Sequence, residues 1–230
     1  MGIPHYLAMT AAELSHCTPA FPTAWLACHF SAYHPGLSNL PISLPPGSLL
    51  VLDDSAPMAN HDPEVIETQL RQCVQALNCQ GLLLDFQRPD NPAARALAER
   101  LTQSFPCPVG VSHLYAQGRN CPVFLPPPPL HSPLSDHLQP WKGREIWLEA
   151  ALEQEHLPLT KAGCQISSAS EIPENGFPDE KLHCHYRAQI LEDAAQFTLW
   201  RTQTDLEGLL AEAEGLGVTL AVGLWQELHE

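Results

Sequence analysis

Short apolar runs alternate with amphipathic segments along the first half of the chain. Continuous apolar runs that stop at turn residues are typical of parallel strands buried on both faces. We therefore expect strands at Thr23–Tyr33, at Ser48–Leu52, from Gly81 onward and at Pro108–Leu114.

Two helices are predicted between these strands. Asp62 is an N-cap acid before Pro63, so a helix begins there and continues to about Leu77. A second helix follows Asp90 or Asn91 and extends from Pro92 to about Ser104. The expected apolar stripe of the first helix consists of Val65, Leu70, Val74 and Leu77.

The order of strand, helix, strand, helix and strand at short spacing predicts a parallel sheet with right-handed crossovers. Before Thr23 the pattern indicates no more than a short helix near Thr10–His16. Further strands are predicted at Pro122–Leu125 and Arg144–Ala150, with a short helix at Ser132–Leu138 between them.

Residues 151–181 interrupt this rhythm, because they are polar and contain no convincing crossover helix. After them, Leu182–Ile190 and Ala194–Thr202 predict an antiparallel hairpin that turns at Glu192 and Asp193. The last elements are a helix at Asp205–Leu216, capped by Thr204 or Asp205 and closed by Gly217, and a strand at Val218–Trp225.

These elements predict an α/β fold, a TIM-like (β/α) barrel in complete or reduced form. We expect residues 1–230 to form a single barrel domain, which is a common length for this architecture. The irregular stretch and the hairpin near 151–200 would be an insertion in the barrel.

Composition narrows the functional classes. The formal net charge of −15 argues against nucleic acid and against anionic membrane surfaces as partners. No stretch approaches the ~20 apolar residues of a membrane span, and Met1–Cys17 lacks the pattern of a signal peptide. A cytoplasmic location is therefore expected, and the eight irregularly spaced cysteines are expected to be free thiols.

The run that begins at Gly81 ends in polar residues. Strand alternation places Asp85 and Gln87 on the same face as Leu83, and Phe86 on the opposite face with the other leucines. In a barrel the first face points inward and the second points at the helices. Asp85 and Gln87 would then rise toward the mouth, where such barrels keep their chemistry.

The segment Gln80–Gln87, QGLLLDFQ, resembles the fourth-strand motif D-G-x-D-x-D-x-E of the family-18 glycoside hydrolases, the chitinase-like barrels. The tail also resembles that family, with a helix at Asp205–Leu216 and a last strand that ends in Gly223, Leu224 and Trp225. The two strands before that helix look like the corresponding sequence in spore-cortex members of the family.

The resemblance implies a glycan site with altered chemistry. Gln80 and Leu83 replace the first two acids of the motif, and Gln87 replaces the glutamate that donates a proton, so only Asp85 is kept. The family's aromatic and acidic pair on the sixth strand would fall near Phe124–Pro127, where prolines stand. Glycosidic cleavage needs an acid at the leaving oxygen, and an amide has no proton to give. Chitinase-type hydrolysis is therefore expected to be lost or rebuilt from other acids.

Other residues are candidates for the same site. Asp53 and Asp54 end the preceding strand. They could bind the substrate or supply a hydrolytic acid or a metal carboxylate, and the alternative is a solvated turn. Glu149 shares a strand face with Glu145 and Trp147, so it could replace the missing acid or be simply exposed. Trp225 could stack beneath a sugar ring or pack in the core.

The pair His183 and His185 lies at the spacing of one strand face and could contribute to a metal site. Three or four ligands are needed for such a site, and no matching spacing is present, so a solvent-facing hairpin is the preferred interpretation. The sequence also contains no glycine-rich phosphate loop, no GxSxG elbow and no HExxH. No metal and no cofactor are predicted.

Three functions follow from the sequence. The first is a barrel that binds an N-acetylated glycan or a peptidoglycan fragment through Asp85, Gln87 and Trp225. The second is an active glycoside hydrolase with relocated acids, drawn from Asp53, Asp54 and Glu149. The third is a non-enzymatic module whose proline-rich loops bind a protein partner.

Overall fold

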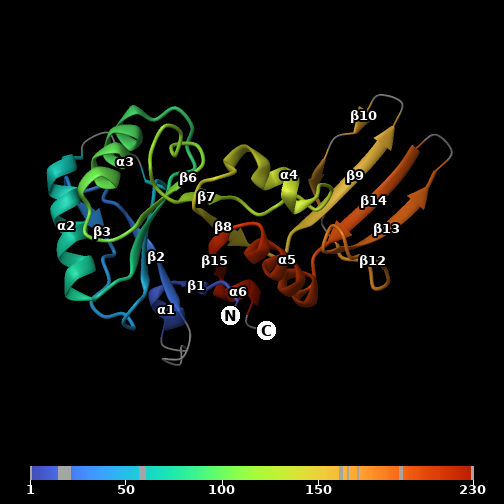
Figure 1. Ribbon diagram of the computed structural model, residues 1–230, viewed down its shortest axis with the longest axis horizontal. Helices are drawn as coiled ribbons and strands as arrows, with labels where there is room; N and C mark the ends of the chain where they lie inside the picture. The colour runs from blue at the N-terminus through green and yellow to red at the C-terminus, as the bar shows by residue number, and fades with distance from the viewer. Residues whose placement is uncertain are drawn as a thin grey trace.

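The computed structural model describes residues 2–14, 22–56, 61–160, 163–164, 166–169, 171–191 and 194–228. Parallel strands in these ranges form a closed barrel in the order β1-β15-β8-β7-β6-β5-β4-β2, and pairing of β1 with β2 closes it (Figure 1). The strands are β1 (His5–Met9), β2 (Thr23–Phe30), β4 (Leu49–Asp53), β5 (Gly81–Asp85), β6 (Val109–Ser112), β7 (Val123–Leu125), β8 (Ile146–Ala150) and β15 (Val218–Leu224). The predicted TIM-like barrel is thus confirmed, and the run from Gly81 is its fourth strand.

The barrel is a reduced one. In the described residues, only α2 (Pro63–Ala76), α3 (Pro92–Ser104) and α5 (Gln203–Gly215) are long helices. The other elements are short: α1 (Ala11–Leu14), β3 (Leu37–Ser38), α4 (Leu134–Leu138), a 3₁₀ turn at Gln139–Trp141 and α6 (Trp225–Leu228). None of the described helices combines the length and the apolar character that a membrane span requires.

Local capping explains why the two N-terminal helices begin where the sequence predicts. The Asp62 side chain accepts a hydrogen bond from the Glu64 N–H, and Asn91 accepts from two N–H groups of the first turn of α3. The apolar stripe of α2 is only partly as predicted, because Leu70 and Val74 are buried whereas Val65 is exposed. Ile66 and Cys73 take the remaining buried positions.

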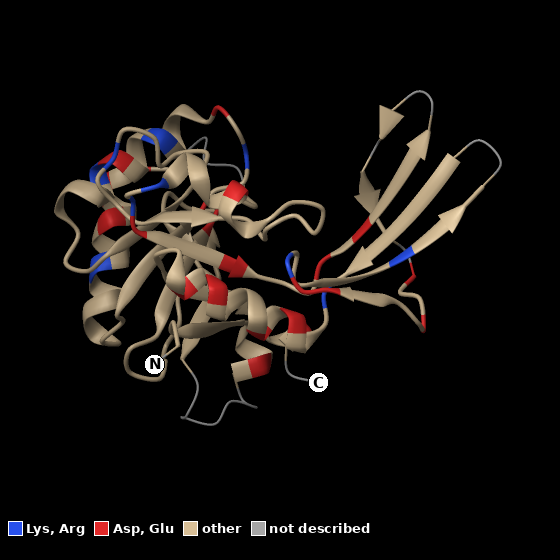
Figure 2. Cartoon of the chain, turned by 45° about the vertical axis from the view of Figure 1, so that its right-hand side comes forward, with Lys and Arg blue, Asp and Glu red and all other residues tan. Residues whose placement is uncertain are grey.

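A second, antiparallel sheet is inserted between β8 and β15, and it projects away from the barrel (Figures 1 and 2). Its order is β10-β9-β14-β13-β12, with β11 also pairing with β9. The strands are β9 (Gln154–Thr160), β10 (Gly163–Cys164), β11 (Ser167–Ser168), β12 (Phe177–Asp179), β13 (Cys184–Ile190) and β14 (Ala194–Trp200). The predicted hairpin is β13 and β14; its proposed turn at Glu192 and Asp193 lies outside the described residues.

Three sequence predictions of local structure are wrong. His5–Met9 is the first barrel strand, although no strand was expected before Thr23; pairing with β15 and β2 on both sides stabilises these five residues. Residues 151–181 are not simply irregular, because β9 lies in the interior of the inserted sheet. The predicted helix at Asp205–Leu216 is present as α5, but its cap is Thr202, which forms a capping box with Asp205, and not Thr204 or Asp205. The predicted helix near Thr10–His16 is confirmed only at Ala11–Leu14, and its end lies outside the described residues.

Two apolar layers hold the barrel together. The inner layer fills the barrel and includes Leu83, Trp147 and Tyr6. The outer layer lies between strands and helices and includes Leu82, Leu84 and Phe86. The alternation predicted for β5 is therefore confirmed, and it fixes which polar side chains can reach the mouth of the barrel.

Candidate functional site at the barrel mouth

Three carboxylates belong to inward faces at the carboxyl ends of barrel strands. On β4, Val51 packs inside the barrel and Asp53 follows two residues later; on β5, Leu83 packs inside and Asp85 follows. Asp53 and Asp85 are direct partners in the register of the two strands. On the seventh barrel strand, Glu149 follows the inward-packed Trp147 in the same way. Because parallel strands end at one edge, these acids share the mouth of the barrel.

Asp85 is the half-buried acid at the end of the fourth strand. Gln87 Nε2 donates a hydrogen bond to Asp85 Oδ1. Burial raises the pKa of Asp85, the Gln87 hydrogen bond lowers it, and the charges of Asp53 and Asp54 raise it, with a net increase. The exposed Gln87 amide and the Asp85 carboxylate therefore form one polar unit at the mouth.

Glu149 has the most strongly shifted carboxyl group of the mouth. Burial, followed by the charges of Asp85, Glu153 and Glu227, raises the pKa of Glu149 to about 7. An acid with this pKa is substantially protonated near neutral pH, so it can donate a proton where an ordinary glutamate cannot.

Asp54 stabilises the loop that follows β5. It is only 2% exposed, and its Oδ1 accepts from the Gln87 N–H at 2.9 Å while its Oδ2 accepts from the Arg88 N–H at 3.0 Å. The sequence reading of Asp54 as part of a solvated turn is therefore wrong. Asp53 Oδ1 accepts a hydrogen bond from the Ser55 N–H at 2.7 Å.

Trp225 lies one residue beyond the last barrel strand, which ends at Leu224. It is the first residue of the short helix α6, and its side chain is half-buried. Its place next to the carboxyl end of β15 fits the predicted neighbourhood of the mouth. A role for Trp225 in stacking against a sugar stays a prediction.

The sequence suggested that His183 and His185 face solvent on one strand, and this is wrong: His183 lies in the turn before β13, His185 lies on β13, and both contact α5. His183 Nε2 lies 2.7 Å from Glu212 Oε2, and His185 Nδ1 lies 2.8 Å from Asp205 Oδ2. In the described part of the chain, no group of three or more histidines, cysteines and acids is arranged to hold a metal ion. The seven cysteines of the described ranges are free thiols.

Sequence reasoning missed two acids that act on Glu149. Glu153 follows β8, and burial raises its pKa although the charge of Arg201 opposes the increase. Glu227 comes from α6, 78 residues after Glu149 along the chain. Neither acid lies on a recognisable strand or motif, so only the three-dimensional arrangement connects them to the site.

Comparison with known proteins agrees with this architecture. A family-18 N-acetylglucosaminidase from Paenibacillus barengoltzii has a TM-score of 0.60 at 9% identity, over 96% of this chain and 94% of that one. The fold is that of the family-18 glycoside hydrolase barrels. No protein-family model and no curated protein sequence matches the chain.

Two further family-18-like structures span different functions. A chitinase-like agglutinin from Robinia pseudoacacia has a TM-score of 0.57 at 11% identity, over 95% of this chain and 93% of that one. The spore cortex-lytic enzyme SleL from Bacillus megaterium has a TM-score of 0.57 at 11% identity, over 96% of this chain and 70% of that one. The same barrel thus occurs in hydrolases and in an agglutinin.

Proposed function

We propose that the barrel mouth binds an N-acetylated glycan, such as a chitin oligosaccharide or a peptidoglycan fragment. The observation that supports this most directly is the hydrogen-bonded pair of Gln87 and Asp85 at the end of the fourth strand. The Asp85 carboxylate is suited to accept a hydrogen bond from an acetamido N–H, and the exposed Gln87 amide can bond a sugar hydroxyl. Trp225 would offer an aromatic face to the ring.

Chitinase-type hydrolysis is not expected at the fourth strand. Gln87 occupies the place of the proton donor in the resembling motif, and an amide cannot protonate a leaving oxygen. Leu83 packs in the apolar interior at the place of another motif acid. The fold that this chain shares with a chitinase-like agglutinin supports a binding function.

Isothermal titration with chitin oligosaccharides and peptidoglycan fragments tests the proposal. We expect heat of binding for at least one of these ligands, and at least a tenfold weaker affinity for Asp85→Ala, because a charge-assisted hydrogen bond is lost. Asp136→Ala is the matched control, since Asp136 is an exposed aspartate in the first turn of α4. Absence of heat with every ligand, or equal binding by both variants, would contradict the proposal.

A second function, hydrolysis by relocated acids, is favoured by one specific observation. Glu149 has a pKa of about 7, and the charge of Asp85 contributes to this value. Glycoside hydrolysis requires an acid that holds its proton together with a second carboxyl group at the same mouth. In this scheme Glu149 would protonate the leaving oxygen, and Asp85 would hold the acetamido group or stabilise the developing positive charge.

The two functions differ in a measurable way. Hydrolysis by Glu149 would release new reducing ends from a chitin oligosaccharide, with a rate that decreases as the pH rises through about 7. Glu149→Gln would abolish this activity and retain binding. Wild-type protein that binds the oligosaccharide at every pH from about 5 to 8 and releases no reducing ends would exclude hydrolysis and leave the binding function intact.

A further inference from the structure

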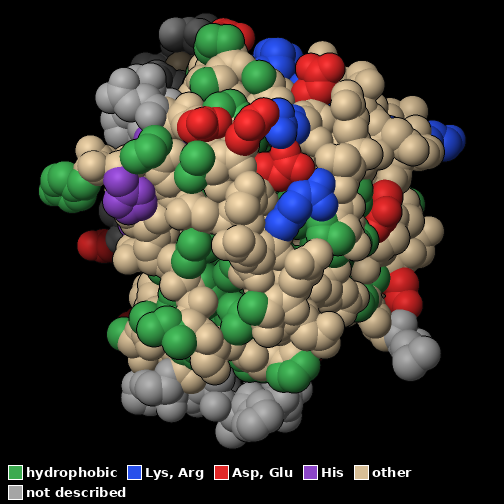
Figure 3. Space-filling model, turned by 90° about the vertical axis from the view of Figure 1, so that its left-hand side faces the viewer, with side chains coloured by type: hydrophobic (Ala, Val, Ile, Leu, Met, Phe, Trp, Pro, Cys, Tyr) green, Lys and Arg blue, Asp and Glu red, His purple; other side chains and the backbone are tan. Residues whose placement is uncertain are grey.

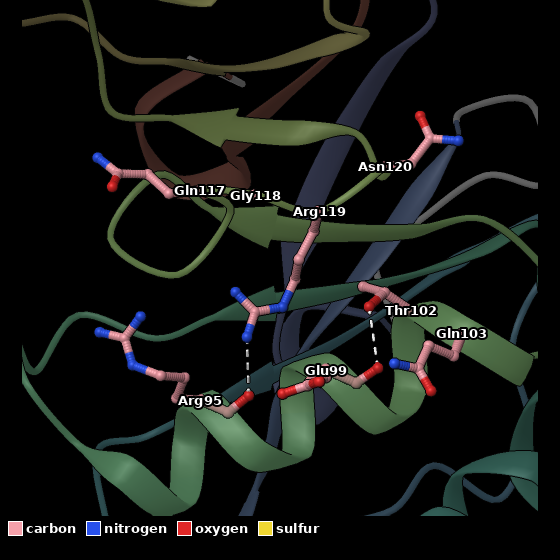
Figure 4. Close-up of a pocket in the computed structure, with 8 residues that line it drawn as sticks. All are labelled: Arg95, Glu99, Thr102, Gln103, Gln117, Gly118, Arg119 and Asn120. Atoms are coloured by element: carbon pink, nitrogen blue, oxygen red, sulfur yellow. Dashed lines mark hydrogen bonds between the residues drawn. The ribbon is translucent and has the colours of Figure 1, made fainter.

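A polar pocket of about 420 Å³ lies on the outer wall of the barrel against α3 (Figure 4), and none of the acids of the mouth lines it. It opens between α3 and the connection from β6 to β7. That connection, residues 113–122, forms turns and no helix, so one flank of α3 is left uncovered. The lining residues are Arg95, Glu99, Thr102, Gln103, Gln117, Gly118, Arg119 and Asn120.

The two arginines of this pocket form no ion pair within the described part of the chain. The Arg95 guanidinium lies over the Tyr115 ring, 5.6 Å from its centroid. Arg119 donates to two backbone carbonyls, those of Tyr115 and Arg95, the second at 3.1 Å. Both guanidiniums therefore lie beside one cavity without a carboxylate in ion-pair contact.

This arrangement is unusual for a chain with 26 acidic and 11 basic residues. Other arginines of the same wall do find acids: Arg71 contacts Glu67 at 2.7 Å, and Arg100 pairs with the same Glu67. Side chains of opposite charge lie close together on this side of the molecule (Figure 3). Much of the basic charge of the barrel gathers there as well (Figure 2). Two guanidiniums that form no ion pair, beside a single carboxylate in the lining, are suited to hold an anion.

The remaining lining groups are suited to hydroxyl groups. The amides of Gln103, Gln117 and Asn120 can both donate and accept, and the Glu99 carboxylate can accept. Figure 4 shows these side chains on both walls of the pocket, those of α3 below and those of the β6–β7 connection above. The volume falls in the range of small-molecule sites, about 300–1,000 Å³.

We propose that this pocket binds a small sugar that bears an anionic group, a phosphate or a carboxylate. Arg95 and Arg119 would pair with the anionic group, and Glu99 with the amides would bond the hydroxyls. The site is separate from the barrel mouth, so it does not depend on the function proposed for Asp85 and Glu149.

Isothermal titration of the full chain tests the proposal with four probes: glucose 6-phosphate, glucuronate, glucose and inorganic phosphate. We expect binding of at least one charged sugar, weaker binding of inorganic phosphate and no binding of glucose. Binding of glucose 6-phosphate would identify the anionic group as a phosphate, and binding of glucuronate would identify it as a carboxylate. Arg95→Gln is expected to weaken binding about tenfold or more, because a charge-assisted contact is lost.

Arg100→Gln is the matched control, because this substitution removes the same charge from the same helix. Arg100 pairs with Glu67 and does not line the pocket. We expect its affinity for the charged sugar to stay within about twofold of wild type. Arg95 is exposed, so thermal unfolding of Arg95→Gln should match wild type and show that the fold is intact. Failure of both charged sugars to bind, equal binding by Arg95→Gln, or equal affinity for inorganic phosphate would overturn the proposal.

Discussion

Replacing Glu149 by glutamine tests whether the charges at the barrel mouth oppose one another in the folded protein. Burial and the neighbouring charges, led by that of Asp85, raise the pKa of Glu149 from 4.5 to about 7. Between these two pH values the unfolded chain has released the proton while the folded chain still holds it. The folded state then binds more protons, so the free energy of unfolding decreases as the pH rises through this range.

The size of the effect follows from the two pKa values. Each pKa unit corresponds to about 1.4 kcal/mol, so an increase from 4.5 to about 7 amounts to an upper limit of about 3 kcal/mol. This contribution to stability is fully present below pH 4.5 and is lost above about pH 7. Glutamine does not titrate, so Glu149→Gln should be more stable than wild type at pH 8 and should lose this advantage toward pH 4.

Urea unfolding followed by tryptophan fluorescence at pH 4, 5, 6, 7 and 8 measures the difference between the two proteins. Asp85 and Glu153 still titrate in the variant, so subtracting the two curves isolates the contribution of Glu149 and its coupling to them. Glu207→Gln is the matched control, because Glu207 is exposed on α5, and its curve should remain parallel to that of wild type. Parallel curves for Glu149→Gln as well would refute the reasoning.

Three further predictions concern stability. Asp54→Ala removes the buried carboxylate that accepts from the Gln87 and Arg88 N–H groups. It should lower the free energy of unfolding in urea by about 2–3 kcal/mol, whereas Asp54→Asn, which keeps one acceptor oxygen, should cost less. Gly110→Ala would place a Cβ 2.2 Å from the Trp147 ring and should cost about 1–3 kcal/mol; an unchanged Tm would contradict this packing. Thr202→Ala removes the N-cap that bonds Asp205 and should cost about 1 kcal/mol in urea unfolding, most of which Thr202→Ser should restore.

Several features were predictable from the sequence because their causes are local. The Asp62 and Asn91 side chains accept from N–H groups within three residues along the chain. The starts of α2 and α3 can therefore be predicted from the local sequence. The alternation along β5 likewise places Asp85 on the face of Leu83 with no knowledge of the partner strands.

Other elements depend on distant partners. The strand His5–Met9 is five residues long and is stabilised by pairing with β15, more than 200 residues later in the sequence. The strand β9 includes a proline and polar residues, and it forms because β14 and two short strands pair with it. Such pairing energy is absent from any local window, so a local pattern cannot predict these strands.

The sequence by itself predicted the barrel architecture and the inward face of β5, and its resemblance to a known motif led to the hypothesis that Gln87 stands in place of a proton donor. Only the tertiary structure decided that Asp54 holds the loop after β5 and that the pKa of Glu149 is raised to about 7. The physical reason is that hydrogen bonding and charge repulsion depend on distance in space. The barrel brings Glu149 toward Asp85 and Glu227, which are 64 residues before it and 78 residues after it along the chain.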